Sequence, residues 1–465
     1  MISKNMHIHF IGICGIGMSG IAKILLEQGF NISGCDQNID STRSKELINL
    51  GCKIDIHLSS TCNDSSISMI VRSSDITLEH PEILQALKNN IPIKLRAEVL
   101  AEIMKQHSNP IAVAGAHGKT TTSSLLSHIF VTANKNPTIV VGGHIHQLNS
   151  NAKYGNSNYL IAEADESDRS FLLLPKKYSI VTNIDREHLG TYKDIEDIKS
   201  SFTTFINTIP KDGLTVICYD NLENRNIFKN IQASYITYGV DKQADFHISN
   251  ITLDAYESYF YVYNNKTKED LGLFQVNLPG HHNVLNATSA IVISLLSDIP
   301  LESIKLALRS FQGVDRRFTF KGKSKVSQAL IFDDYGHHPT EIEATLKVAR
   351  NASQGKVIIA FQPQRFSRTK NLWDEFIQVF AHAPIDELIL TDIYPANEAP
   401  IEGITSKNLM LEIKKINPNL SIQYISSREP DEILIQLIES NLSKNDLLLF
   451  LGAGKINKLS EKMIA

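Results

Sequence analysis

The sequence predicts an α/β protein of about three domains. The chain has 465 residues, and a soft prior of about 150 residues per domain gives roughly that number. Short β-branched runs alternate with amphipathic helical stretches, a pattern typical of parallel α/β units. Two glycine-containing loops each lie between a strand-like run and a helical run, so we expect two sites for phosphate groups.

The expected strands are short apolar runs, several of which are followed by an amphipathic stretch. In chain order they are HIHFIGI (7–13), SMIVRSS (68–74), PIAVAG (110–115), YLIAEAD (159–165), YSIVTNID (178–185), KVIIAFQ (356–362), ELILTDIY (387–394) and DLLLFLGAG (446–454). The polar segment 105–110 ends in proline just before a strand, and segment 311–318 marks a second joint. The expected domains are therefore 1–108, 109–315 and 316–465.

Composition excludes several classes of protein. A net charge of −4 gives neither the basic surface that nucleic acids need nor a polybasic membrane anchor. Because there is no signal peptide and no run of about 18 apolar residues, we expect a cytoplasmic protein without membrane insertion. No C-x-x-C pair is present, so we expect reduced thiols at the five cysteines Cys14, Cys35, Cys52, Cys62 and Cys218.

The second glycine loop, AVAGAHGKTTTSS (112–124), predicts an ATP site. Backbone N–H groups and a helix N-terminus starting near Thr120 would bind phosphates, Lys119 would reach the terminal phosphate, and the Thr120 hydroxyl would bind Mg²⁺. Val113 stands where a full Walker A sequence has glycine, so the loop is the shorter G-x-x-G-K-T. A turn that only connects strand and helix is the alternative, and the strand-loop-helix context favours ATP.

Two strand ends supply candidate metal ligands. Glu163 ends one apolar run and His188 lies just beyond another, at the carboxyl ends of strands where α/β crevices form. Singly, each has a common alternative as a solvated residue. Together with Thr120 they form a candidate Mg²⁺ set, although histidine is an unusual ligand for this cation.

The first glycine loop, FIGICGIGMSG (10–20), has Gly15, Gly17 and Gly20 in G-x-G-x-x-G spacing. Asp36 lies 19 residues after Gly17, where a carboxylate could bind a nicotinamide-cofactor ribose. The residues alone leave the bound nucleotide open.

An ordered set of motifs from near residue 7 to about residue 459 resembles the Mur ligase family, and within it the branch that adds the first amino acid of the peptidoglycan stem peptide. The motifs are HFIGICGIGMSGIA, AGAHGKTTT, EADESD, VTNIDREHLGTY, PGHHNVLNA, GVDRRF, DDYGHHPTEI, FQPQRFSRT and GAGKI. The resemblance implies an N-terminal Rossmann-like UDP-binding domain, a central P-loop ATPase-like domain with a mostly parallel sheet, and a C-terminal Rossmann-like domain for the amino acid.

The resemblance also implies the reaction and its partners. ATP, with Mg²⁺, would convert the muramoyl carboxylate of UDP-N-acetylmuramate to an acyl phosphate, which the amine of L-alanine attacks, releasing phosphate beside the ADP. An unactivated carboxylate is a poor electrophile, so most of the work is positioning and charge stabilisation. The expected state is a monomer or weak homodimer.

By the same resemblance, site residues are assigned in groups. The catalytic residues are Lys119, Arg317 and His337. The ATP contacts are Gly115, Ala116, His117, Gly118, Lys119, Thr120, Thr121, His282, Asn283, Asn286, Arg317, Asp333 and Asp334. The UDP-sugar contacts are Gly15, Ile16, Gly17, Met18, Ser19, Asp36, Ser73, Ser74 and Arg96. The amino-acid contacts are Tyr335, His337, Arg365 and Arg368, and the metal ligands are Thr120, Glu163 and His188.

Alternatives remain for several of these residues. Asn283 and Asn286, three apart on one helix face, could be a cap and a surface amide. His337 could belong to a merely polar loop. Arg365 and Arg368 could converge on one carboxylate or on a phosphate.

The sequence also departs from the family pattern. Gln364 stands where the family often has histidine, and Cys14 where it often has glycine; we interpret Cys14 as a small buried residue. EADESDRSF contains no lysine, the residue that other branches carbamylate near the metals, so one metal is better supported than two.

Two other functions remain open. A sibling ligase attaches a preformed murein peptide to the same UDP-sugar, and DDYGHHP together with the 465-residue length favours the alanine-adding branch instead. A nucleotide-binding protein without turnover is the other alternative, against which the intact Lys119, Thr120, Glu163, His188 and Arg365 argue.

Overall fold

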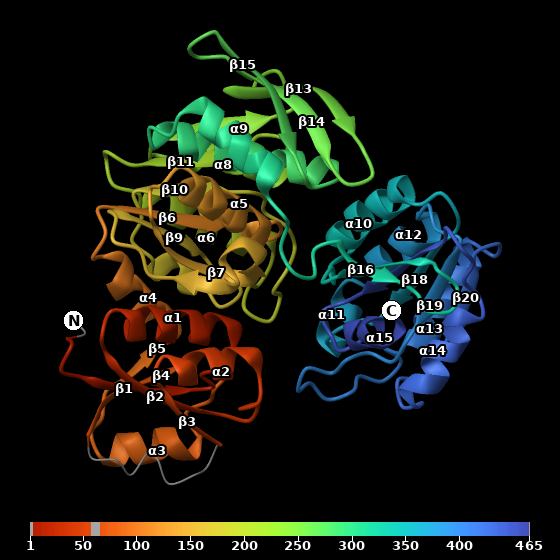
Figure 1. Cartoon of the computed structure of the whole chain (residues 1–465), viewed down its shortest axis with the longest axis horizontal. Coiled ribbons are helices and arrows are strands. Elements are labelled where there is room, and N and C mark those ends of the chain that lie inside the picture. The colour runs from red at the N-terminus through yellow and green to blue at the C-terminus, as the bar shows by residue number, and fades with distance from the viewer. Residues whose placement is uncertain (1–2, 57–65, 465) are drawn as a thin grey trace. The chain divides into compact units, whose positions relative to one another are not determined.

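The structure is a computed structural model that describes residues 3–56 and 66–464, and it contains three sheets (Figure 1). Each sheet carries helices on it, and the three-domain α/β architecture expected from the sequence is confirmed. Of the five cysteines, Cys62 lies outside the described residues. The four described cysteines are buried free thiols. Within the described residues, no helix is long and apolar enough to cross a membrane.

The N-terminal sheet has five parallel strands in the order β3-β2-β1-β4-β5, which is the strand order of a Rossmann half. Helices α1 and α4 cover one face, and α3 packs on the other. Its elements are β1 (His7–Ile11), α1 (Ile16–Glu27), β2 (Asn31–Asp36), α2 (Thr42–Asn49), β3 (Lys53–Ile56), β4 (Ile67–Arg72), α3 (Pro81–Lys88), β5 (Ile93–Leu95) and α4 (Arg96–Met104).

The central sheet has ten strands in the order β15-β14-β13-β12-β11-β10-β6-β9-β7-β8. The pairs around β6 are parallel, and β8 pairs antiparallel with β7. Its strands are β6 (Asn109–Ala114), β7 (Thr138–Ile145), β8 (Ser150–Lys153), β9 (Tyr159–Glu163), β10 (Tyr178–Val181), β11 (Leu214–Cys218), β12 (Tyr235–Gly239), β13 (Phe246–Leu253), β14 (Ser258–Asn264) and β15 (Glu269–Val276). Its helices are α5 (Lys119–Thr132), α6 (Ile195–Asn207), α7 (Leu222–Ile227), α8 (His281–Leu296) and α9 (Leu301–Ser310), with short 3₁₀ turns at His146–Leu148, Ser170–Leu173 and Phe228–Asn230.

The C-terminal sheet has six strands in the order β16-β17-β21-β18-β19-β20, and only its edge pair β16-β17 is antiparallel among the described pairings. All five residues of β18 and of β21 are buried, as expected for central parallel strands covered on both faces. Its elements are β16 (Thr319–Lys323), β17 (Leu330–Asp334), α10 (Pro339–Ala352), β18 (Val357–Phe361), α11 (Phe366–Asn371), α12 (Trp373–His382), β19 (Glu387–Leu390), α13 (Ser406–Ile416), β20 (Ser421–Tyr424), α14 (Asp431–Glu439), β21 (Leu447–Leu451) and α15 (Asn457–Met463).

The chain divides into two compact units. The first unit holds residues 1–250, 260–275 and 285–312, and so includes the N-terminal sheet and most of the central one. The second unit holds residues 251–259, 276–284 and 313–465.

All eight strands expected from the apolar runs are present, as β1, β4, β6, β9, β10, β18, β19 and β21. The helix expected near Thr120 begins at Lys119, and Pro339 is the first residue of α10, where its missing N–H costs no hydrogen bond. Strands β13, β14 and β15 were not expected, because polar side chains occupy many of their positions and no apolar run marks them. The sequence also did not predict β2, β3, β5, β7, β8, β11, β12, β16 and β20.

Candidate active site

The P-loop between β6 and α5 has a backbone that only glycine fits at two positions. Gly115 has φ +140°, and a Cβ there would lie 1.9 Å from the Thr182 hydroxyl. Gly118 has φ +82°, and its Cβ would lie 2.6 Å from Oδ1 of Asn286 on α8. The loop is therefore packed against the end of β10 and against α8, and it leads into the N-terminus of α5, where phosphate binds in such loops.

Lys119 begins α5 and lies in a cage of oxygens. Its Nζ donates to the carbonyl of Gly115 at 2.6 Å and of Ala116 at 3.0 Å, and it pairs with the buried carboxylate of Glu166 at 2.8 Å. Burial lowers the pKa of Lys119, but the carboxylates of Glu166, Glu163 and Asp165 together raise it above its ordinary value. The amine is thus a fixed cation at the mouth of the phosphate loop.

Thr120 and Glu163 face each other at the ends of α5 and β9. The Thr120 hydroxyl lies 3.0 and 3.1 Å from the two carboxylate oxygens of Glu163, and Oε2 of Glu163 also accepts from the Gly142 N–H at 2.8 Å. Burial raises the pKa of Glu163, which Lys119 and these donors only partly offset. A divalent cation beside this pair would relieve that cost, and hydroxyl and carboxylate oxygens suit Mg²⁺.

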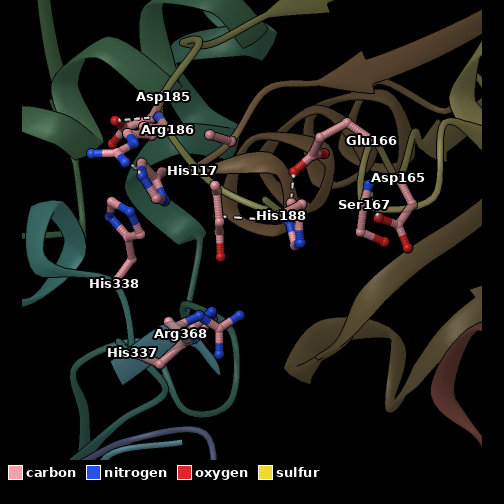
Figure 2. Close-up of polar contacts among 12 residues, drawn as sticks. His117, Asp165, Glu166, Ser167, Asp185, Arg186, His188, His337, His338 and Arg368 are labelled. Atoms are coloured by element: carbon pink, nitrogen blue, oxygen red, sulfur yellow. Dashed lines mark hydrogen bonds and ion pairs between the residues drawn. The ribbon is translucent and has the colours of Figure 1, made fainter. Parts of the chain in front are cut away.

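His188 belongs to a second acidic group, which Figure 2 shows around Glu166. The Nε2 of His188 lies 3.3 Å from Oε1 of Glu166 and 3.7 Å from Oε2 of Glu187. Burial lowers the pKa of His188, but the two carboxylates raise it overall. One ligand atom from each of these three residues lies within 4.8 Å of the others, so the group could hold a cation as well.

His117, in the middle of the P-loop, is fixed by the strand end of β10. Its Nε2 pairs with Asp185 at 2.8 Å, its N–H donates to Asn183 at 2.8 Å, and its carbonyl accepts from the Thr182 hydroxyl at 2.7 Å. Figure 2 shows the His117 ring directed at Asp185. These three contacts hold the P-loop against the segment that follows β10.

The glycine loop of the N-terminal sheet lies between β1 and α1. Gly15 caps α1 without a side-chain hydrogen bond, which leaves the first N–H groups of the helix open to an anion. Asp36, at the end of β2, accepts from the Cys14 N–H at 2.9 Å, and Ser19 donates to the Ile16 carbonyl. Asn151 of β8 donates to that same carbonyl at 2.7 Å, so the central sheet supports the loop from behind.

The structure also places Cys14, Ser73 and Ser74 relative to this glycine loop. Cys14 is 3% exposed, as expected for a small buried residue. Arg43 donates to the Cys14 carbonyl at 2.7 Å. Ser73 and Ser74 directly follow β4, at the same edge of the sheet as the loop. Their contact with a UDP-sugar stays a prediction.

In the second unit, a cluster around Glu341 joins several of the predicted residues. Arg317 Nη1 lies 3.5 Å from one carboxylate oxygen of Glu341, and His337 Nδ1 lies 3.5 Å from the other. The Arg316 and Arg317 guanidinium groups lie 4.7 and 5.7 Å from the centre of the Tyr335 ring. The structure thus gathers Arg317, Tyr335 and His337 around Glu341.

Three further predicted residues, His282, Asn283 and Asn286, lie in the first turns of α8. Asn283 donates to the Pro279 carbonyl at 2.8 Å, and Asn286 lies against Gly118 as described. His282 is buried, and burial together with Arg317 lowers its pKa to about 4, so this ring is neutral at pH 7. A neutral imidazole can both donate to and accept from a nucleotide.

Asp333 and Asp334, at the end of β17, differ in their surroundings. Asp334 accepts from the Phe318 and Gly336 N–H groups, both at 2.7 Å, and so fixes the turn. Asp333 pairs only loosely with Arg316, at 3.5 Å. Burial raises the pKa of Asp333 to about 6, although Arg316 lowers it. Burial also raises the pKa of Asp334, although its partners lower it, so both carboxylates carry a cost of charge in the folded state.

Replacing Asp333 by asparagine is expected to raise stability at neutral pH by about 1–2 kcal/mol. Its ordinary pKa is 3.8, so the folded state binds the proton more tightly than the unfolded state does, and wild-type stability falls as pH rises from about 4 to about 6. The gain in melting temperature should therefore be present at pH 7.5 and vanish near pH 4. Arg316 retains the Gly452 carbonyl as a partner at 2.6 Å.

Asp446→Asn serves as the matched control for this pH series. Asp446 is 5% exposed and accepts from the Ser443 and Lys356 N–H groups, both at 2.8 Å. An amide has one acceptor oxygen fewer, so this variant should melt lower at every pH. An Asp333→Asn gain that was equal at pH 4 and pH 7.5 would contradict the account.

Arg365 and Arg368 flank the start of α11 but have separate partners. Arg365 Nη1 lies 3.7 Å from Glu398, while Arg368 donates to the side chain of Gln364 at 3.0 Å. Gln364 thus orients the Arg368 guanidinium. Convergence of both arginines on one anion stays a prediction.

Sequence reasoning missed several carboxylates that shape the site, among them Glu166, Asp185, Glu187 and Glu341. Glu166 is 3% exposed and contacts both Lys119 and His188. Its signal was present in EADESD, where a second glutamate follows Glu163 by three residues at a strand end. Asp185 ends the expected strand run YSIVTNID, but its pairing with His117 depends on the fold.

Three models of Mur ligase domains match this chain. The model described as Mur ligase family, catalytic domain, matches residues 7–108, the Mur ligase middle domain matches 113–294, and the Mur ligase, glutamate ligase domain, matches 316–454. Together they cover nearly the whole chain.

Curated relatives and solved structures agree with these matches. The UDP-N-acetylmuramate--L-alanine ligases of Geotalea daltonii and Desulfotalea psychrophila are 42% and 43% identical to this chain, over 100% of it and 98% of theirs. The crystal structure of UDP-N-acetylmuramate-alanine ligase from Thermotoga maritima has a TM-score of 0.80 at 26% identity and covers 98% of both chains. A murein peptide ligase from Psychrobacter arcticus, with a TM-score of 0.72 at 22% identity, shares the fold.

Proposed function

Because the chain belongs to the Mur ligase family, we propose that it joins L-alanine to the muramoyl carboxylate of UDP-N-acetylmuramate, using ATP. The observation that carries this proposal is the P-loop, whose Lys119 and Thr120 face the carboxylates of Glu166 and Glu163. Such an arrangement serves phosphoryl transfer, the step that activates a carboxylate for amide formation.

Lys119 has the central role in the first step. The ammonium group at the start of α5 offsets the charge that develops on the terminal phosphate oxygens during transfer. The N–H groups at the start of α5 bind the same phosphates. The muramoyl carboxylate attacks the γ-phosphorus, the bond to the ADP oxygen breaks, and an acyl phosphate forms.

Thr120 and Glu163 would hold Mg²⁺, and His188 with Glu166 and Glu187 could hold a second cation. The donor set fits, because hydroxyl and carboxylate oxygens converge within hydrogen-bond distance at a buried place. When bound, the metal supplies charge neutralisation and orientation of the phosphates. The second acidic group supports two metals despite the missing carbamylated lysine.

His337 has a part in the second step. The amine of L-alanine must lose a proton before it attacks the acyl carbon, and an imidazole held near Glu341 can take it. The tetrahedral intermediate then collapses, and inorganic phosphate leaves with the C–O bond electrons. Arg365 and Arg368 bind the alanine carboxylate, and Arg317, His282, Asn283, Asn286 and Asp333 contact ATP.

The first glycine loop binds the UDP part of the sugar substrate. Its diphosphate would lie at the open N-terminus of α1, with Asp36, Ser73, Ser74 and Arg96 around it. We place the domain boundaries at 1–108, 109–315 and 316–465, which the ends of the family matches at 108 and 316 support. We expect the enzyme to work in the cytoplasm as a monomer or weak homodimer.

The test is ADP release by the purified protein with ATP, Mg²⁺ and UDP-N-acetylmuramate. No amine, L-alanine, L-serine, glycine and the recycling tripeptide are compared. Dependence on L-alanine supports the proposal; some turnover with glycine or serine is expected, since one methyl group discriminates by only about 1–3 kcal/mol. Turnover with the tripeptide alone would identify the sibling ligase, and no turnover with any amine would identify a non-catalytic nucleotide-binding protein.

A further inference from the structure

An ion pair joins the helix that follows the N-terminal sheet to the acidic segment of the central sheet. Arg96 is the first residue of α4, and Asp165 comes two residues after Glu163. Arg96 Nη2 lies 3.4 Å from Oδ2 of Asp165, and both residues belong to the first unit. The side chains of Arg96 and Asp165 are 21% and 41% exposed, so the ion pair is partly shielded from solvent.

The other side of the Arg96 guanidinium packs on Gly17, in the first turn of α1. A Cβ at Gly17 would lie 2.9 Å from Nη1, 3.1 Å from Cδ and 3.3 Å from Cζ of Arg96. The guanidinium therefore lies beside the N-terminus of α1, where the helix dipole already attracts anions. Glycine at position 17 leaves the room that this side chain occupies.

Asp165 is itself held rigidly. Its Oδ1 accepts from the Ser167 N–H at 3.0 Å, and its carbonyl accepts from the Phe171 N–H at 3.1 Å. Figure 2 shows Asp165 and Ser167 side by side, next to Glu166. The oxygen that faces Arg96 is therefore fixed in direction.

The segment 163–166 thus presents three carboxylates to three different groups. Glu163 faces Thr120, Glu166 faces Lys119, and Asp165 faces Arg96. Two of these contacts belong to the ATP side of the site, and the third reaches toward the glycine loop that would bind the UDP-sugar. Asp165 therefore links the ATP side of the site to the glycine loop.

We propose that Asp165 is a positioning residue for the sugar substrate: it holds the Arg96 guanidinium on Gly17, so that the diphosphate of UDP-N-acetylmuramate meets a preorganised cation. The inference rests on the proposed function and deepens it. An arginine already ordered in its binding geometry loses less freedom when the anion arrives, and affinity rises for that reason. The same rigid segment also sets the spacing between the sugar diphosphate and the phosphate loop.

Asp165→Asn is the test variant, because the amide can still accept from Ser167 but loses the charge that faces Arg96. The Michaelis constant for UDP-N-acetylmuramate is expected to rise about 5–20-fold. The values of kcat and of the Michaelis constant for ATP should stay within about twofold, because Glu166 and Glu163 still hold Lys119 as a cation. A general loss of structure would lower kcat and the melting temperature instead. A fall in kcat with an unchanged Michaelis constant for the sugar would overturn the proposal.

Coupling to Arg96 gives the second readout. Arg96→Lys loses the planar fork and should also raise the Michaelis constant for the sugar. If Asp165 acts through Arg96, adding Asp165→Asn to Arg96→Lys should have little further effect. Additive effects of the two substitutions would overturn the proposal.

The matched control is Asp386→Asn in the second unit. Asp386 pairs with Arg350 at 2.9 Å, the side chains are 42% and 33% exposed, and its carboxylate also accepts from the Val357 N–H at 2.7 Å. Like the Asp165 pair, it is a partly exposed aspartate–arginine ion pair whose carboxylate also accepts from a backbone N–H, but it contains no predicted site residue. Its Michaelis constants should equal those of the wild type.

A second pair of variants and a calorimetric titration complete the test. If the asparagine variant does not fold, Asp165→Glu retains the charge and should show a smaller rise in the Michaelis constant than Asp165→Ala; equal rises would count against the proposal. Calorimetric titration with UDP-N-acetylmuramate in the absence of ATP separates this inference from the proposed function. A wild-type protein that binds the sugar but never turns over would refute the function, and weaker binding by Asp165→Asn would still support the positioning role.

Discussion

Replacing Lys119 by alanine is expected to lower ADP release by about 10³-fold while leaving the binding of UDP-N-acetylmuramate within about twofold of the wild type. The ammonium group is fixed by the Gly115 and Ala116 carbonyls and by Glu166, at the start of α5 where phosphates bind. Removing it takes away the fixed charge that stabilises phosphoryl transfer. Steady-state ADP release and a sugar titration on the same preparation measure the two effects.

The alanine variant also leaves the buried carboxylate of Glu166 without the Lys119 cation, with His188 as its remaining partner, which costs about 3–5 kcal/mol of stability. Lys119→Met combined with Glu166→Gln removes both charges and should restore much of the melting temperature but none of the activity. Lys119→Arg keeps a cation of different shape and should retain partial activity. Turnover by Lys119→Ala near the wild-type rate would show that the lysine has no catalytic role.

Replacing Glu163 by glutamine should raise the Mg²⁺ concentration needed for half-maximal ADP release by about 10–100-fold and lower kcat at saturating Mg²⁺. The amide keeps one acceptor for Gly142 and Thr120 but removes the negative charge. Thr120→Ala should act in the same direction, and the double variant should be less than additive because both residues would serve one cation.

Glu387→Gln is the control for the magnesium titration. Glu387 is also a buried carboxylate, 8% exposed, and it accepts from Gln423 of β20 and from Asn441, which follows α14. Its variant should show the wild-type magnesium dependence. If Glu163→Gln showed that same dependence, Glu163 would not be a metal ligand.

Local sequence patterns predicted where the functional residues lie along the chain better than they predicted which residues contact them. The run PIAVAG and the following GKT were enough to predict β6, the loop and α5, because glycine and apolar periodicity act over a few residues. The alternation of strands and helices likewise predicted the parallel sheets. Strands β13, β14 and β15 were not predicted because many of their side chains are only partly buried or exposed, so no continuous apolar run marks them in the sequence.

Contacts between distant segments could not be predicted from the residues alone. Glu166 lies 47 residues from Lys119, and Asp165 lies 69 residues from Arg96, so only the folded sheets bring each pair together. The family resemblance named Lys119 and Arg96 but gave no reason for the carboxylates that hold them. Burial of Glu166 makes its pairing obligatory, which is visible only in three dimensions.

The most direct test of the central claim follows the oxygen atoms of the substrate. UDP-N-acetylmuramate carrying heavy oxygen in its muramoyl carboxylate is incubated with ATP, Mg²⁺ and L-alanine, and the released inorganic phosphate is analysed by mass spectrometry. An acyl-phosphate route predicts one heavy oxygen atom in each phosphate, with phosphate formation dependent on L-alanine. Phosphate without the label would mean that water attacks ATP directly, and would contradict the proposed ligase reaction.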